Sequence, residues 1–218
     1  MKYFIISFGI ILFVLFSTSC NLVVIPEPCM RDYSFEIPVV LNPALDTFKI
    51  GDTIHIEIAF PVEMKDQKSG EYFDMSEFPF NLEFNISWID IDPAISADKD
   101  ITYVPKTGDI QMVALTGANA GKAVLLRLVK ENRKFKHSFD IIVNKSGLLV
   151  FGFDANIDNY FSYSLDDDCR NENYSILFNL NNGLENNFEL LQYSIDEYYH
   201  SIEKEYFDSW GGYVFVVE

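Results

Sequence analysis

Two stretches of the chain alternate apolar and polar residues with the period of a β-strand. In residues 54–60 (IHIEIAF) and 82–88 (LEFNISW), most of the residues that interrupt the apolar ones are polar. Successive side chains of a strand point to opposite faces of its sheet, so each stretch has one buried face and one solvated face. A chain that contains such stretches must place a sheet against another apolar layer.

Further strands are expected at short intervals along the chain, with turn residues such as Thr107-Gly108-Asp109 between them. Pro38 suggests that the first of them lies at a sheet edge, because proline cannot donate a ladder hydrogen bond. The fold class predicted is an antiparallel β-sandwich, immunoglobulin-like or similar, rather than a parallel α/β sheet. The additional strands are expected at residues 33–41, 101–104, 110–115, 123–129, 135–143, 148–153 and 213–217, with 123–129 and 135–143 forming a hairpin.

One helix is expected near the carboxyl end. Ser194 and Glu197 fit the capping box S-x-x-E, apolar residues then recur at helical spacing, and Gly211 ends the pattern. Residues 184–192 are ambiguous between extended chain and helix. Residues 33–218 are expected to form a single β-rich domain.

Residues 1–19 have the features of a secretory signal. Lys2 supplies positive charge, residues 4–16 are almost wholly apolar, and small residues follow. Residues 22–25 are apolar too, so an uncleaved membrane anchor is the alternative.

The small residues before Cys20 resemble the lipobox of bacterial lipoproteins, in which the cysteine after the cleavage point carries the lipid. Thr18 and Ser19 match that pattern, whereas Ser17 stands where an aliphatic residue is usual. Ordinary cleavage after Ser19 without lipid is the other interpretation. The resemblance implies a lipid on Cys20, a tether over residues 20–32, and a protein anchored in a membrane of the cell envelope, facing the periplasm or the cell surface.

The chain is strongly acidic, with 33 Asp and Glu against 16 Lys and Arg and a net charge of −17. Nucleic acid and anionic bilayer surfaces repel such a protein. No nucleic-acid partner is therefore expected, and attachment to a membrane must come from the leader or its lipid.

Two cysteines remain once Cys20 is assigned to lipid. In an exported protein, Cys29 and Cys169 are expected to form a disulfide, although two separate thiols are the alternative. No C-x-x-C motif occurs, so zinc-ribbon and thioredoxin-like chemistry have no support.

Three short segments, together with the leader, resemble the small uncharacterised envelope lipoproteins of Bacteroidetes-type bacteria. These segments are DTFKIGDTI at residues 46–54, NNGLENN at 181–187 and GGYVF at 211–215. The resemblance implies a β-rich envelope lipoprotein and says nothing about a substrate.

An aromatic cluster near the carboxyl end is the first candidate ligand site. Exposed rings suit sugars or a protein partner, whereas rings at helical spacing also pack against sheets, so both interpretations stay open. Tyr199, Trp210 and Tyr213 are the residues selected from a cluster that also contains Tyr193, Tyr198, Tyr206 and Phe207.

The second candidate is a calcium loop that begins with Asp154, Asn156 and Asp158. Asn159 and Leu165 stand where an EF-hand has glycine and a bidentate glutamate, so that motif fails and an ordinary Asx-rich turn is favoured. No metal or other cofactor is assigned.

Catalytic signatures are scarce. The three histidines, His55, His137 and His200, come without a G-x-S-x-G motif, and His137 falls among apolar residues as a structural histidine does. The function predicted is a non-enzymatic, lipid-anchored module that binds a protein or glycan partner in the envelope. The alternative is a secreted glycan-active hydrolase that uses paired carboxylates.

Overall fold

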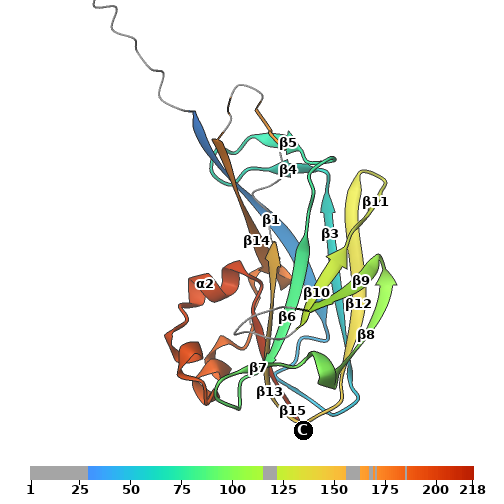
Figure 1. The fold of residues 1–218 in the computed structure, drawn as a ribbon, viewed down its shortest axis with the longest axis vertical. Coiled ribbons are helices and arrows are strands. Elements are labelled where there is room, and N and C mark those ends of the chain that lie inside the picture. Colours follow the sequence, from blue (N-terminus) through green and yellow to red (C-terminus); the bar gives the residue numbers. More distant parts are fainter. Residues whose placement is uncertain (1–28, 115–121, 156–162, 167–168, 170, 185) are drawn as a thin grey trace, which may run out of the picture.

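The computed structural model describes residues 29–114, 122–155, 163–166, 169, 171–184 and 186–218 (Figure 1). They form a mostly β structure in which two large sheets pack face to face, as predicted. A small hairpin of β4 (Glu63–Lys65) and β5 (Tyr72–Asp74) lies near one end of the long axis, and the α-helix α2 (Lys204–Ser209) lies beside the sheets toward the other end.

The first large sheet, here sheet A, has six strands in the order β11-β12-β3-β1-β14, with β8 also pairing β12. All pairs are antiparallel except β1–β14, which is parallel. The strands are β1 (Met30–Asn42), β3 (Thr53–Pro61), β8 (Ile101–Thr107), β11 (Val129–Glu131), β12 (Lys134–Val143) and β14 (Asn171–Leu180).

The second large sheet, sheet B, has seven strands in the order β2-β15-β13-β6-β10-β9, with β7 pairing β6. Its one parallel pair is β15–β2. The strands are β2 (Thr47–Phe48), β6 (Leu82–Trp88), β7 (Ile95–Ser96), β9 (Asp109–Ala114), β10 (Lys122–Arg127), β13 (Gly147–Ala155) and β15 (Tyr213–Val217).

The main core lies between the two sheets. Phe84 on β6 packs against Phe139 on β12, with ring centroids 5.3 Å apart, and Phe153 on β13 stacks on Phe178 of β14 at 5.4 Å. The predicted alternation at 54–60 and 82–88 is confirmed, because Ile54, Ile56, Ile58, Phe60, Leu82, Phe84, Ile86 and Trp88 are all buried.

A second, smaller core lies on the outer face of sheet B. Because it covers β13 from outside, residues 148–153 are buried on both faces, which explains why this stretch is continuously apolar rather than alternating. Its buried members are Ile89, Leu148, Val150, Leu191, Phe207 and Val214.

Several details of the predicted strand arrangement were wrong. Pro38 does not mark an edge: β1 has β14 on one side and β3 on the other, and Pro38 directly precedes the residues that pair with β3. By contrast, the turn predicted at residues 107–109 is confirmed; it carries the chain from β8 in sheet A to β9 in sheet B. The hairpin around Asn132 and Arg133 joins β11 to β12, whereas β10 pairs β6 and β9 in the other sheet.

The carboxyl-terminal prediction was partly wrong. Ser194 does not cap a long helix; residues 188–209 instead form two 3-10 helices, Phe188–Tyr193 and Glu197–Ser201, followed by α2. The strand at 213–217 is confirmed as β15. β14 was not predicted from the sequence, although Tyr174, Ile176, Phe178 and Leu180 alternate along Asn171–Leu180 and pack toward the main core.

Candidate binding site

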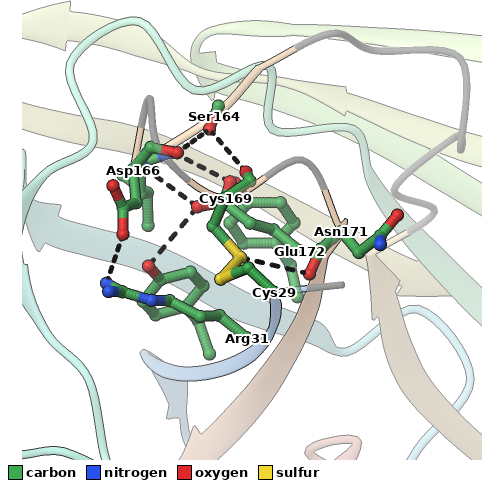
Figure 2. Close-up of polar contacts among 10 residues, drawn as sticks. Cys29, Arg31, Ser164, Asp166, Cys169, Asn171 and Glu172 are labelled. Carbon is green, nitrogen blue, oxygen red and sulfur yellow. Dashed lines mark hydrogen bonds and ion pairs between the residues drawn. A yellow bond between two sulfur atoms is a disulfide. The ribbon is translucent and has the colours of Figure 1, made fainter. Parts of the chain in front are cut away.

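The amino-terminal end of the described domain is held by a disulfide. Cys29 and Cys169 are joined with their Cα atoms 5.2 Å apart, across 140 residues of sequence, which confirms the predicted pair (Figure 2). The bridge ties the start of β1 to the chain that leads into β14, the strand beside it. Cys20 lies outside the described residues, so its lipidation stays a prediction.

Glu172 organises the chain next to this disulfide. Its carboxylate accepts the backbone N–H groups of Leu165 and Asp166, both at 2.9 Å, and the hydroxyl of Tyr174 at 2.5 Å. Asp166 in turn pairs with Arg31 on β1 at 2.6 Å (Figure 2). Burial, followed by the neighbouring Glu172 carboxylate, raises the pKa of the Tyr174 phenol, so this hydroxyl stays a donor. We call this region, residues 29–34 with 163–174, the tether end.

Asp66 fastens the β4–β5 hairpin to the same end. Its carboxylate is buried and accepts the N–H groups of Ser34 and Ser69, each at 2.7 Å. Burial alone would raise the pKa of Asp66, but these donors outweigh it and hold the pKa below its ordinary value.

The three aromatic residues selected from the sequence do not form an exposed platform. Tyr213 is 1% exposed, and its hydroxyl donates to the carbonyl of Leu45 at 2.6 Å. Trp210 lies against Gly152, where an added Cβ would stand 2.0 Å from the indole Cε3 atom, so the absence of a side chain on β13 makes room for the ring. Tyr199 is half-buried against the smaller core, and burial raises its pKa to about 12.

Other members of the aromatic cluster are the exposed ones. Tyr193, Tyr198 and Tyr206 are 66%, 60% and 61% exposed, and Ile195 between the first two is 59% exposed. Tyr193 and Tyr198 lie on the two 3-10 helices, Ile195 lies between these helices, and Tyr206 lies on α2. Because three short helices follow one another, no single helical phase runs through residues 188–209, and local periodicity could not separate the two groups.

Polar bonds to the end of β6 hold the exposed segment in place. The Ser194 hydroxyl donates to the carbonyl of Ile89 at 2.9 Å, and Asp196 accepts the N–H groups of Ala94 at 2.9 Å and Tyr198 at 3.0 Å. These donors lower the pKa of Asp196. We call residues 186–212 the C-terminal layer.

A groove of about 360 Å³ lies where the C-terminal layer meets the edge of sheet A. The edge strand β14 contributes residues 177–180, α2 contributes the other wall, and Leu184, which is 70% exposed, stands at its rim. The wall from α2 is acidic. The carboxylates that line the groove are Glu36, Glu205 and Asp208, and the amides are Asn179 and Asn186.

Two of these carboxylates are positioned by neighbours. Glu36 accepts the side-chain amide of Asn179 at 2.9 Å across β1 and β14. Asp208 accepts Asn186 at 2.8 Å and pairs with Lys204 at 3.0 Å, a residue outside the lining. Among the described residues that line the groove, none is lysine, arginine or histidine, so the lining itself is anionic. Lys204 lies next to it, with its Nζ atom 3.0 Å from Asp208 and 3.4 Å from the side-chain oxygen of Asn186.

The remaining candidates do not assemble into a site within the described residues. Asp154 is exposed near the end of β13, whereas Asn156 and Asp158 lie outside the described residues, so the calcium loop stays a prediction. In the described parts of the chain, no three His, Cys, Asp or Glu side chains are arranged to hold a metal ion.

The histidines are dispersed. His55 and His137 lie on opposite faces of sheet A: His55 contacts Asp140 at 2.7 Å on the outer face, and His137 is fully buried in the interior. His200 bonds the carbonyl of Ser194 at 2.9 Å.

The pKa values of five described carboxyl groups lie below their ordinary value; these groups are Asp66, Asp74, Glu131, Asp140 and Asp196. At Asp140, burial acts in the opposite sense but is outweighed by bonds from His55 and Lys106. A general acid for glycoside cleavage needs the reverse, a carboxyl group whose pKa is raised.

Comparisons with known proteins add little to this geometry. No family model matches the chain, and no curated protein matches it. Among solved structures, a conjugative transposon lipoprotein from Bacteroides eggerthii is similar over 56% of this chain and 88% of its own, at 16% identity and a TM-score of 0.19. That likeness is too low to carry an argument about fold or function. Within the described residues, no helix is long and apolar enough to cross a membrane.

Proposed function

We propose that this protein is a non-enzymatic binding module of the bacterial envelope, tethered to a membrane by a lipid on Cys20. Its C-terminal layer and the adjoining groove bind a protein or glycan partner. The observation that carries the proposal is the Cys29–Cys169 disulfide, because stable disulfides form in oxidising compartments outside the cytoplasm.

The position of the disulfide supports the tether. Cys29 follows Cys20 by nine positions, a stretch that spans at most about 32 Å when fully extended. β1 begins at Met30, immediately after the bridge, so a pull on the anchor reaches a covalently closed end of the sandwich. The C-terminal layer lies away from this end, where a partner can reach it (Figure 1).

The exposed side chains support binding rather than catalysis. Tyr193, Ile195, Tyr198 and Tyr206 of the C-terminal layer place apolar area in solvent, and the groove at the edge of this layer is anionic. Large exposed apolar patches are typical of interaction surfaces, and we propose that these side chains form one.

The anchor is tested with Cys20→Ser in intact cells. We expect the wild-type protein to incorporate labelled fatty acid and to sediment with membranes, and the variant to lose the label and remain soluble. Cys20→Ser protein that stayed lipid-labelled and membrane-bound would contradict the tether.

The binding role is tested by chemical crosslinking in intact cells with the wild-type protein as bait, followed by analysis of captured proteins and glycans. A paired replacement of Tyr193 and Tyr198 by serine should reduce the specific capture. Tyr72→Ser, an equally exposed tyrosine on β5 at the opposite end, is the matched control and should leave capture unchanged.

A further inference from the structure

We infer that the groove between β14 and α2 binds an extended, basic polypeptide segment of the envelope partner. This inference rests on the proposed function and names the class of ligand and its site. The edge strand β14, the composition of the lining and its charge all point to this ligand.

The groove lies at a strand edge. β14 ends the strand order of sheet A, with β1 on one side; on its other side, within the described part of the chain, Phe178, itself part of the groove lining, is bridged to Trp210. An extended polypeptide would therefore lie in the groove mainly through side-chain contacts and could use backbone groups of β14 only beside that bridge. The lining residues 177–180 run for about 13 Å at the rise of a strand, which matches four to five residues of ligand.

The residues that line the groove favour a peptide over a sugar as its ligand. The exposed apolar contributor is aliphatic Leu184, and the ring that lines the groove, Phe178, is 3% exposed. The described lining residues offer no accessible aromatic face on which a sugar ring could stack. Aliphatic side chains of a peptide can instead pack on Leu177 and Leu184.

The charge selects a basic peptide. Glu36 and Glu205 stand on opposite walls, one on β1 and one on α2, and both are exposed. Alternate side chains of an extended segment point in opposite directions, so lysine or arginine can face the carboxylates while intervening residues contact the aliphatic rim. Such rim pairs raise the association rate and make binding depend on salt.

The first experiment measures binding of defined peptides to the full chain in detergent micelles by fluorescence anisotropy. The probe is a labelled nonapeptide of alternating lysine and valine, compared with a glutamate–valine version and with a lysine–valine version interrupted by proline. We expect binding of the first alone, weakened about tenfold between 50 and 300 mM NaCl. Equal binding of the acidic peptide would overturn the inference.

Matched variants locate the site. The pair Glu36→Gln and Glu205→Gln should weaken the lysine–valine probe by about threefold to tenfold, because each exposed ion pair contributes modestly. Glu63→Gln, an exposed carboxylate on the distant strand β4, is the control and should leave affinity unchanged. An equal loss of affinity in Glu63→Gln would show that binding follows the overall charge of the protein, and would contradict binding in the groove.

A crosslinking experiment in cells separates failure of the groove from failure of the proposed function. A photo-crosslinking phenylalanine analogue replaces Leu184 in the groove, or Tyr198 in the C-terminal layer outside it. A crosslink from position 184 to a basic segment supports the inference. A crosslink from 198 alone, or a glycan or second copy at 184, overturns the groove assignment and keeps the binding module. No crosslink at either position overturns both.

Discussion

The tether end and the C-terminal layer are both attached to the sandwich, but by different forces. The tether end is closed by the Cys29–Cys169 bond and by carboxylates, Glu172 and Asp66, that accept several donors each. The C-terminal layer contains no cysteine and is held by a small apolar core around Phe207 together with the bonds of Ser194 and Asp196 to the chain after β6. Its backbone forms short 3-10 turns, which are weaker than long helices or sheet ladders.

The difference indicates a division of roles. We expect a region closed by a disulfide and by charge-assisted hydrogen bonds to stay folded when its anchor is pulled. A layer without a disulfide can open locally without unfolding the sheets. We therefore expect the C-terminal layer to be the less stable of the two, as binding surfaces commonly are.

The largest expected effect comes from removing the disulfide. Cys29→Ser together with Cys169→Ser releases a loop of 140 residues, and the chain-entropy model predicts a loss of about 4 to 5 kcal/mol in the free energy of unfolding. Urea unfolding with and without reductant measures it. A loss below about 1 kcal/mol would contradict the expectation that the disulfide makes the tether end the more stable of the two regions.

Phe207→Ala tests the opposite region. Its side chain is fully buried in the smaller core, and truncation should cost about 3 to 4 kcal/mol locally. Hydrogen exchange should show residues 186–212 losing protection while residues 30–42 keep theirs. Phe139→Ala, in the core between the sheets, is the comparison and should lower the protection of both regions. If Phe207→Ala also lowered protection in residues 30–42, the C-terminal layer would not unfold independently of the sheets.

Asp66→Asn probes the charge at the tether end. Losing charge-assisted bonds to Ser34 and Ser69 should cost about 2 kcal/mol at neutral pH. Since the folded-state pKa of Asp66 is lowered, its contribution is complete above about pH 4 and is lost as pH falls below that value. Denaturant unfolding between pH 3 and 7 measures it, with exposed Asp32→Asn as the control; parallel pH profiles for wild type and Asp66→Asn would contradict this account.

The smallest effect concerns His137, which lies between the sheets and belongs to neither region. Its Nδ1 atom bonds the carbonyl of Arg127 at 3.0 Å, while Nε2 is buried without a partner among the described residues. Burial lowers the pKa of this imidazole, so stability should be complete above about pH 6.5 and decline as pH falls below it. Thermal unfolding of His137→Gln should lack that decline, whereas His200→Gln should keep it.

The sequence determined those features that local chemistry controls. Alternation around Ile56 and Phe84 specified strands and their buried faces, because the period of a strand is fixed by its backbone. Cys29 and Cys169 could be paired because few cysteines leave few choices.

Only the tertiary structure decided which strands are neighbours and which aromatic rings are exposed. The alternation of Tyr174, Ile176, Phe178 and Leu180 in β14 is a local pattern, but the parallel pairing of β14 with β1, more than 130 residues earlier in the chain, is not. Tyr213 and Tyr198 are the same residue type, yet one fills the main core and the other faces solvent. Which of the two tyrosines is buried depends on how β15 and the C-terminal layer pack in the fold. The groove is likewise a tertiary feature, because β14 and α2, which form it, are connected by no local sequence pattern.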